Sequence, residues 1–307
     1  MKPTWDVCAL GCVCWDTVGT VTEYPGPDEK ASLGALVQQG GGRAGTAAAA
    51  VAALGGSVRI FGRLGDDDFG TQIVAEFARQ NVDTGGLDIV AGESSQYAFC
   101  VAHEQTGQRM IFYKHGSAER LTADDVDLDA LTDCRCLLVD SHHPGAAIAA
   151  AQTARERGVP VVLDAERPQD ELGELLACID YMVLPRSLVE QLGDGDEARG
   201  IAELMGHSPK ALVITRGAAG CDVHTADGHF HQPAFTVPKV IDTTGAGDVF
   251  HGAFAYFVSQ EYSLAETVAF ASATAALSTT ALGGRGHLPS LSEVKSLVYG
   301  LGSTCSN

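Results

Sequence analysis

The sequence predicts an α/β fold of three layers, with a mainly parallel central sheet flanked by helices and a small additional β-sheet. Two observations carry this prediction: short β-branched runs alternate with helical patterns along most of the chain, and two segments break that rhythm. Alternation of this kind is the signature of βαβ units on a parallel sheet. A length of 307 residues allows one large domain or two smaller ones, and we expect a single domain over residues 1–307.

Six β-branched runs are expected to form strands of the main sheet, with helices in the gaps between them. The predicted strands are 6–14, 58–62, 136–140, 159–164, 181–184 and 211–215. The predicted helices are 43–54, 69–80, 145–157, 187–192, 197–205, 246–259 and 264–280. The first of these helices contains four consecutive alanines and ends at Gly55-Gly56, a helix stop.

The two segments that break the rhythm are 17–39 and 96–114, where apolar and polar residues alternate in short stretches. Pro25-Gly26-Pro27 divides the first segment and Thr106-Gly107 divides the second, which indicates hairpins. We expect the two segments to pair as one small sheet that forms a lid over the ligand-binding edge. The alternative is that they extend the edge of the main sheet.

Charge excludes two classes of partner. The chain has 20 basic and 39 acidic residues, a net charge of −19, whereas binding to nucleic acid or to an anionic membrane needs a basic face. With no apolar run of transmembrane length and no signal-peptide pattern at the start, a cytoplasmic location is expected. The nine cysteines occur singly or as C-x-C, so we expect buried, reduced thiols rather than a zinc site.

The strongest motif is DTTGAGDVFHG at residues 242–252, which runs directly into an apolar helical pattern. Gly245 and Gly247 let the backbone turn its N–H groups toward a ligand, and the helix that follows adds the positive end of its dipole. Asp248 falls in the first helical turn, where it could take a proton from a hydroxyl beside the anion. The helix dipole is expected to lower the pKa of Asp248. The segment suits phosphoryl transfer to an alcohol; the alternative is an ordinary helix cap with glycines that tighten the turn.

This segment resembles the C-terminal signature of the ribokinase or PfkB family of sugar kinases. The resemblance extends to GGGRAGTAAAAVAALGG at 40–56, FGRLGDDDFG at 61–70, ITRGAAGCDV at 214–223 and GGRGHLP at 283–289, and so covers nearly the whole chain. It implies a ribokinase-like fold and transfer of the γ-phosphoryl group of MgATP to a sugar hydroxyl.

The resemblance also implies roles for single residues. For phosphoryl transfer it implies that Asp248 is the catalytic base and that the backbone of Gly245, Ala246 and Gly247 is the anion hole. For the sugar it implies contacts from Asp16, Gly41, Gly42 and Arg43. We place Asp16 just after the first strand, at its carboxyl end, where open α/β sheets bind ligands.

On the nucleotide side, the resemblance implies that Thr215, Gly217 and Gly220 border ATP and that Gly284 lies near the base. Asp242 and Thr244 match positions that lie beside a monovalent cation such as K⁺ in some members of the family; a purely structural role is the alternative. Many members also carry N-x-x-E near magnesium, where this chain has Arg186 and, one place late, Glu190.

Within the family the likeness is greatest to members that phosphorylate 6-deoxy-6-sulfofructose at its 1-hydroxyl, on stretches such as SSQ at 94–96 and HQPAF at 231–235. Lys30 matches a sulfonate-binding lysine of those members, whereas Tyr113 and His142 replace their asparagine and arginine. Loss of the arginine matters because its planar fork suits tetrahedral anions, and Arg109 or Lys114 would have to compensate. Fructose or another ketohexose, ribose and ketodeoxygluconate are the alternative substrates.

Two other functions, a dehydrogenase and a non-catalytic sensor, have to be weighed against a sugar kinase. Gly40-x-Gly42-x-x-Gly45 fits the dinucleotide-binding pattern of a dehydrogenase, but it follows the lid segment instead of a buried strand. A sensor of sugars or nucleotides that keeps the fold without catalysis is the second rival. The apolar run 98–101 predicts that two lids pair and that the protein is a homodimer.

Overall fold

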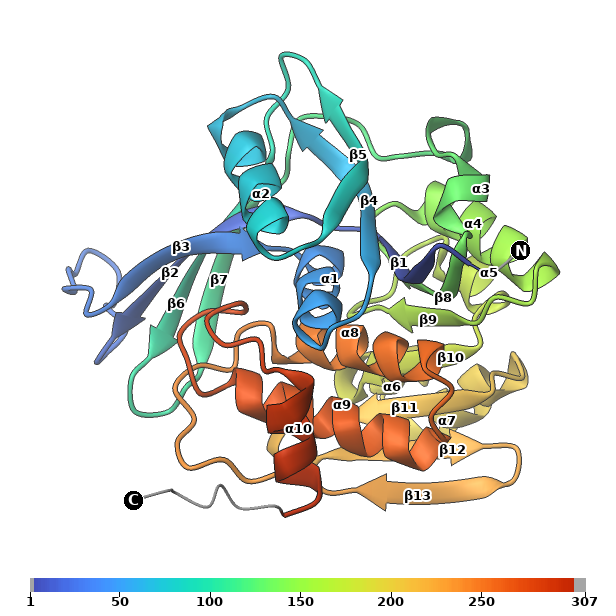
Figure 1. Cartoon of the computed structure of the whole chain (residues 1–307). Coiled ribbons are helices and arrows are strands. Elements are labelled where there is room, and N and C mark those ends of the chain that lie inside the picture. Colours follow the sequence, from blue (N-terminus) through green and yellow to red (C-terminus); the bar gives the residue numbers. More distant parts are fainter. Residues whose placement is uncertain (1–2, 301–307) are drawn as a thin grey trace.

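The main sheet has nine strands in the order β13-β12-β11-β10-β9-β8-β1-β4-β5 (Figure 1). The structure is a computed structural model that describes residues 3–300. All neighbours in the sheet are parallel except β11–β12 and β12–β13. The strands are β1 (Trp5–Leu10), β4 (Val58–Gly65), β5 (Asp83–Val90), β8 (Cys134–Asp140), β9 (Val161–Asp164), β10 (Tyr181–Pro185), β11 (Ala211–Thr215), β12 (Cys221–Thr225) and β13 (Gly228–Gln232).

Helices cover both faces of this sheet, which confirms the three layers. One face carries α1 (Arg43–Ala53), α2 (Asp68–Arg79), α8 (Ala246–Ser259), α9 (Leu264–Ser278) and α10 (Leu291–Val298). The other carries α3 (Leu128–Leu131), α4 (Pro144–Glu156), α5 (Leu172–Leu176), α6 (Arg186–Leu192) and α7 (Glu197–Gly206). Along β1, Val7 and Ala9 pack into the first core and Cys8 and Leu10 into the second, as the two-residue period of a strand requires.

A separate four-stranded sheet projects from the side of the main body, at the left of Figure 1. Its order is β3-β2-β6-β7, with β2 (Cys14–Val21), β3 (Leu36–Gly41), β6 (Gln96–His103) and β7 (Arg109–Lys114). Two antiparallel hairpins, β2–β3 and β6–β7, meet through a parallel pair that runs from Cys14 opposite Gln96 to Val21 opposite His103. The expected small sheet is therefore confirmed, and the alternative of an extended main sheet is wrong.

The predicted strand 6–14 is in fact two elements. β1 ends at Leu10 and β2 begins at Cys14, so Asp16 lies inside the small sheet and not behind a strand of the main sheet. A Cβ on Gly11 would fall 2.2 Å from the Asp140 carboxyl group, and the Cys12 N–H donates to Asp140 Oδ2 at 2.7 Å. The buried carboxylate thus lies against the backbone where the chain leaves the main sheet.

The cysteines in the described part of the chain are free thiols, as expected. Seven of them are buried and Cys178 is partly buried, while Cys305 lies outside the described residues. Between residues 3 and 300, no helix is both long enough and apolar enough to span a membrane.

Candidate active site

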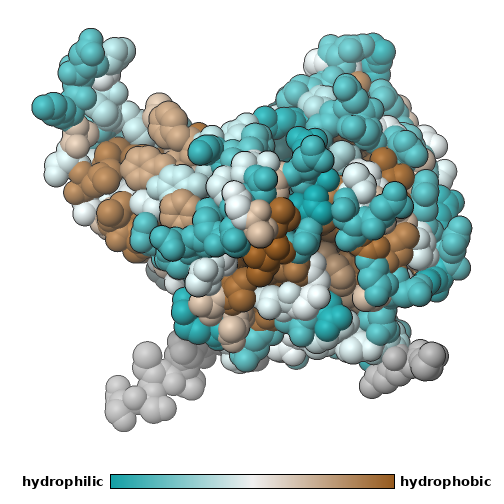
Figure 2. Space-filling model, turned by 90° about the horizontal axis from the view of Figure 1, so that it is seen from above, coloured by the Kyte–Doolittle hydropathy of each residue, from teal (hydrophilic) through white to brown (hydrophobic). Residues whose placement is uncertain are grey.

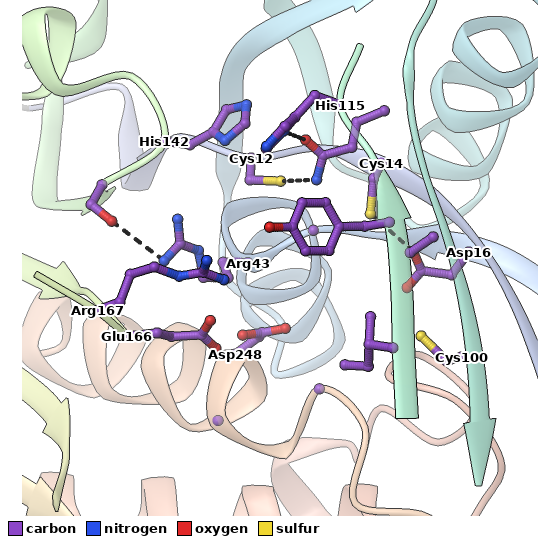
Figure 3. A pocket seen from close by; sticks show the side chains of 18 of the residues that line it. Cys12, Cys14, Asp16, Arg43, Cys100, His115, His142, Glu166, Arg167 and Asp248 are labelled. Atoms are coloured by element: carbon purple, nitrogen blue, oxygen red, sulfur yellow. Dashed lines mark hydrogen bonds between the residues drawn. The ribbon is translucent and has the colours of Figure 1, made fainter. Parts of the chain in front are cut away.

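A cavity of about 590 Å³ lies between the small sheet and the main body. Its walls come from β2, β6 and β7 on one side and from the start of α1, the chain after β8 and β9, and the start of α8 on the other (Figure 3). It brings together nine of the residues expected at the site: Asp16, Gly42, Arg43, Tyr113, His142, Thr244, Gly245, Gly247 and Asp248.

The turn before α8 has the geometry of an anion-binding site. Gly245 caps the helix in the left-handed conformation, with φ 70° and ψ 0°, and a Cβ there would lie 2.6 Å from Gly284 Cα. A Cβ on Gly247 would meet no atom within 4 Å, so this side of the turn faces open space in the cavity. Ala246 N–H donates to Thr243 O at 3.3 Å, which leaves the Gly247 and Asp248 amides as first-turn donors without an intrahelical acceptor.

The pKa of Asp248 is raised and not lowered as expected. Burial, followed by the nearby Asp164 and Glu166 carboxylates, raises the pKa of Asp248 well above its usual value, whereas Arg43 and Arg109 oppose the rise. Figure 3 shows Glu166 and Asp248 beside each other near the Arg43 guanidinium. The expected lowering of this pKa is wrong because burial and two like charges outweigh the helix dipole. A higher pKa makes Asp248 a stronger base.

Asp16 lies on the opposite wall of the cavity, on β2. Its side chain is 8% exposed, and Cys14 Sγ donates to its Oδ1 at 2.9 Å. A Cβ on Gly41 would fall 2.0 Å from Asp16 Oδ2, so the absence of a side chain at Gly41 admits this carboxylate. Burial raises the pKa of Asp16, against the opposing effects of the Cys14 hydrogen bond and the Arg285 charge.

Arg285 is a buried residue of the site that the sequence analysis did not identify. Its Nη2 donates to Gly41 O at 3.0 Å, and its Nη1 lies 3.3 Å from Glu76 Oε1. Glu76 Oε2 in turn accepts from Gly40 N–H at 2.9 Å. The arginine in GGRGHLP therefore joins the C-terminal loop to the end of β3 and to α2, and it holds the Gly40–Gly41 backbone beside Asp16.

Asp242 joins the same loop to the glycine turn. Its Oδ1 accepts from both the backbone N–H (2.9 Å) and the hydroxyl (2.8 Å) of Thr244, and its Oδ2 accepts from Gly283 N–H at 2.8 Å. Asp242 is 1% exposed. Each carboxylate oxygen therefore has a donor from the protein itself, which is the pattern of a structural clamp.

Charged side chains of both signs line the cavity, four arginines and five carboxylates. The charged residues that the sequence analysis did not place there are Arg120, Glu166, Arg167, Asp170 and Glu171, and His115 joins His142 nearby. Arg109, which also lines the cavity, donates to Thr243 O (3.2 Å) and Thr243 Oγ1 (3.0 Å) and so ties β7 to the glycine turn. Glu166 and Arg167 follow the end of β9 after Ala165, a position at the carboxyl edge of the sheet that could have identified them.

Lys30 is not brought to the cavity. It lies exposed in the connection between β2 and β3 and is not among the residues that line the cavity. Lys114 neighbours Tyr113 on β7, and because side chains alternate along a strand it faces the other side of the small sheet.

The residues expected on the nucleotide side do not line this cavity. Thr215 lines a second, open hollow of about 620 Å³ together with Arg186, Glu190 and Arg216. Gly217 and Gly220 shape the turn after β11 with positive φ angles of 56° and 91°. Arg186 pairs with Glu190 at 2.8 Å and with Glu197 at 2.9 Å. Arg186 is therefore held by ion pairs at the position where the N-x-x-E motif of many family members has its asparagine.

Comparison with known proteins matches this architecture to one family. The model of the pfkB family of carbohydrate kinases matches residues 5–291. The chain belongs to the pfkB family of carbohydrate kinases. Its curated relatives include an ATP-dependent ribose-1-phosphate kinase of Halopiger xanaduensis, 31% identical over 81% of this chain and 83% of the relative. Fructokinase-1 of Zea mays is 29% identical, over 86% and 90%.

Solved structures of the family confirm the ribokinase-like fold. The ribokinase of Arabidopsis thaliana complexed with ribose and ATP superposes with a TM-score of 0.82 at 24% identity, covering 97% of this chain and 99% of the other. This pfkB-family protein is thus a carbohydrate kinase, a phosphotransferase with an alcohol group as acceptor.

Proposed function

We propose that the cavity holds a small ketose-like sugar between Asp16 and Asp248, with the transferring phosphoryl group at the glycine turn. The observation that carries this proposal is that the buried Asp16 of the small sheet and the half-buried Asp248 of α8 line one cavity, and that free helix amides lie beside Asp248. Asp16 would accept hydrogen bonds from sugar hydroxyls. Asp248 would take the proton of the attacking hydroxyl, while the Gly247 and Asp248 amides stabilise charge on the phosphoryl oxygens.

The residues present fit a magnesium–ATP complex. Gly245 lies against Gly284 and Gly247 faces open space, so the turn leaves room for phosphate oxygens close to the backbone. Within residues 3–300, no three His, Cys, Asp or Glu side chains converge to hold a metal by themselves, and Mg²⁺ is commonly held by phosphates, waters and one or two carboxylates. Glu166 is the carboxylate best placed beside Asp248 for that purpose. Bound Mg²⁺ would neutralise charge on the β- and γ-phosphates.

The positive charges around His142, from Arg43, Arg120 and His115, support a substrate that carries an anionic group. Burial lowers the pKa of His142, and the positive charges of Arg43, Arg120 and His115 lower it further, against the raising effect of Asp140. A sulfonate or phosphate bound there would relieve this repulsion. The relative named as a ribose-1-phosphate kinase also acts, by that name, on a sugar that carries an anion.

We therefore propose 6-deoxy-6-sulfofructose, phosphorylated at its 1-hydroxyl, as the substrate, with Arg120, His115 and His142 on the sulfonate in place of Lys30. Fructose or another ketohexose is the second candidate, favoured by the curated fructokinase relatives. Ribose and ketodeoxygluconate follow. A sensor without catalysis would keep the cavity without turnover.

A panel of acceptors tests this proposal. ADP release would be measured with sulfofructose, fructose, fructose phosphates, ribose and ketodeoxygluconate, using wild type and Arg120→Gln, with Arg199→Gln, an exposed arginine of α7, as the matched control. We expect turnover with sulfofructose, and a KM for it about tenfold higher in Arg120→Gln, as loss of one charge-assisted hydrogen bond predicts. Turnover of fructose alone, unaffected by Arg120→Gln, would assign the cavity to neutral ketoses, and no turnover with any sugar would favour the sensor.

Asp242 is proposed to act structurally, because its oxygens already accept three hydrogen bonds. This predicts the same turnover in potassium and in tetramethylammonium salts. The alternative, a K⁺ site beside Asp242 and Thr244, predicts that turnover rises with K⁺ and is absent without it.

We also propose that the protein is a homodimer through its small sheets. The run 98–101 is not the apolar face that was expected to pair, because Ala98 and Cys100 line the cavity and Val101 is buried. The exposed apolar side chains of the small sheet are instead Leu36 (56%) on β3 and Met110 (47%) and Phe112 (62%), which alternate along β7 with residues that line the cavity. Figure 2 shows hydrophobic residues gathered on the projecting arm. A second copy of the chain would cover this apolar face, because the same side chains can meet across a two-fold axis.

A further inference from the structure

Two cysteines lie in the cavity beside Asp16, and the reaction proposed above uses neither of them. Cys12, Cys14 and Asp16 line the cavity from one stretch of chain. Val13 and Trp15, which lie between them, pack into the core, as the two-residue period of an extended chain requires. Both thiols are thus shielded from bulk solvent, at 6% and 4% exposed, but face a cavity of about 590 Å³ that admits a small reagent.

The surroundings of the Cys12 sulfur favour negative charge on it. Gln96 Nε2 donates to Cys12 Sγ at 3.1 Å (Figure 3), and Gln96 Oε1 lies 3.2 Å from His115 Nδ1, which holds the amide in this orientation. Burial lowers the pKa of Arg43, but the Asp140 carboxylate and, among weaker effects, the Cys12 sulfur raise it above its usual value. The Arg43 guanidinium is therefore close enough to interact with this sulfur. An N–H donor and a nearby cation are typical of reactive cysteines.

Cys14 lies next to Cys12 and is held as a thiol. Its Sγ–H donates to Asp16 Oδ1 at 2.9 Å (Figure 3). The neighbouring Cys12 side chain, followed by burial and the Asp16 charge, raises the pKa of Cys14 well above its usual value. Residues two apart in a chain have Cα atoms at most about 7 Å apart, and a disulfide bridges up to roughly that separation. The two cysteines are therefore placed as an attacking thiol and its partner.

We propose that Cys12 and Cys14 are a redox modification site, at which a hydroperoxide joins them as a disulfide and thereby inactivates the kinase. With hydrogen peroxide, Cys12 Sγ attacks one oxygen, the O–O bond breaks, and the products are a sulfenic acid on Cys12 and one water. Cys14 Sγ then attacks the Cys12 sulfur while its proton passes to the hydrogen-bonded Asp16 carboxylate, and the sulfenic oxygen leaves with that proton as a second water. The two thiols thus give two electrons and two protons to the peroxide, which becomes two waters.

The disulfide acts on the sugar site through Asp16. It removes the Cys14 hydrogen from Asp16 Oδ1, so the buried carboxylate loses the donor that orients it toward the cavity. The pairing of the thiols stands on their own contacts, whereas the loss of turnover rests on the proposed role of Asp16 as a sugar ligand.

Mass spectrometry of the full-length protein tests the pairing without substrate. Reduced protein would be treated with hydrogen peroxide at a dose that oxidises the partly buried Cys178, then unfolded, alkylated and digested with trypsin, which leaves Cys8, Cys12 and Cys14 in one peptide. We expect that peptide to lose two hydrogens, to carry an alkyl group on Cys8 alone, and to fragment at residues 9–11 but not inside the Cys12–Cys14 loop. Dithiothreitol before alkylation should reverse this. Alkylation of both Cys12 and Cys14 after peroxide, or a bond from Cys8 to either, would overturn the proposal.

ADP release before and after peroxide tests the inactivation. At full conversion to the disulfide, kcat/KM for the sugar should fall about tenfold or more in wild type, as the loss of a hydrogen bond to a charged group predicts, and dithiothreitol should restore it. Cys12→Ser lacks the attacking sulfur, so the same dose should lower its own untreated activity by less than about twofold. Cys178→Ser is the matched control and should respond as wild type does. Equal losses in Cys12→Ser and wild type would overturn the proposal.

The two readouts separate this inference from the proposed function. If no sugar of the panel is turned over, mass spectrometry still decides whether the thiols pair. A disulfide that forms while turnover is unchanged would overturn the inactivation and count against Asp16 as a sugar ligand. Should Cys12→Ser not fold, wild type carries the test alone: inactivation that precedes the disulfide, or that dithiothreitol does not reverse, would overturn the proposal.

Discussion

Gly245 and Gly247 stand two positions apart but are glycines for different reasons. Gly245 has a φ of 70° and its missing side chain admits Gly284, whereas Gly247 is helical and faces open space. The motif alone suggested one shared reason, backbone freedom. The structure separates a conformational requirement from a requirement for room beside the backbone.

These two glycines predict opposite effects of the same substitution. Gly245→Ala should destabilise the fold by about 1–3 kcal/mol, because it strains a left-handed residue and collides with Gly284. Gly247→Ala should leave the melting temperature unchanged or slightly higher, since alanine favours a helix, but should raise the KM for ATP. Thermal melts and coupled kinetics of both variants check this; equal loss of stability in both would contradict it.

His143 predicts a pH dependence of stability. It is 3% exposed, and its Nδ1 accepts from Leu121 N–H at 3.1 Å, so the folded protein holds the ring neutral. Burial, with the neighbouring His142 charge, lowers the pKa of His143 to about 3 from 6.5. The unfolded chain therefore binds the proton first, so stability is fully present above pH 6.5 and declines as the pH falls toward 3.

Urea unfolding at pH 7 and pH 4 measures this contribution. Removal of the His143 titration in His143→Gln should reduce the loss of unfolding free energy over that range by about 3 kcal/mol. The glutamine oxygen can still accept from Leu121 N–H. An identical pH dependence in wild type and variant would show that other groups cause the acid destabilisation.

At the scale of elements, the C-terminal loop is held to β3 and α2 by one buried ion pair. Arg285→Met leaves the buried Glu76 carboxylate without its cation, which should lower the free energy of unfolding by about 3 kcal/mol and also loosen Gly41 beside Asp16. Arg199→Met breaks an exposed pair with Asp194 and should change it by less than about 1 kcal/mol. Chemical denaturation of both variants measures these changes. Similar small losses of unfolding free energy in both would show that the Arg285 network does not anchor the loop.

Element boundaries could be predicted where hydrophobic periodicity is strong. Helix 246–259 agrees with α8 to the residue, and 43–54 agrees with α1 to within one residue. β5 was missed because Gly85 and Gly86 interrupt its pattern, and β12 and β13 because CDVHT and GHFHQ are short and rich in polar residues. The predicted strand 6–14 is longer than β1 because the strand ends where Gly11 meets Asp140. Residues this far apart in the chain cannot be paired from local sequence.

On the scale of the whole molecule, motifs predicted the backbone of the site better than its charges. The glycine turn, Asp16 and Asp248 converge on one cavity as expected. Arg120 and Arg167 reach it from loops that carry no motif, and the raised pKa of Asp248 depends on carboxylates more than 80 residues earlier in the chain. The local sequence indicates the helix dipole, which lowers the pKa of Asp248, but not the distant carboxylates that raise it.

The proposed dimer is also a property of the whole molecule. Sedimentation velocity at micromolar concentration should show a species of twice the 31.9 kDa chain mass, and Phe112→Glu should convert it to monomer by placing a charge in the apolar interface. Ile89→Glu, at an exposed apolar position on β5 outside the small sheet, should leave the dimer intact. A monomeric wild-type protein would contradict the proposal.

The central claim is that Asp248 takes the hydroxyl proton of a sugar beside the glycine turn, and Asp248→Asn tests it most directly. Side by side, ADP release and calorimetric sugar binding would be measured for wild type and variant with the best acceptor of the panel. We expect kcat of Asp248→Asn to fall about a thousandfold and its sugar affinity to stay within about threefold of wild type. Turnover by Asp248→Asn close to that of wild type would contradict it.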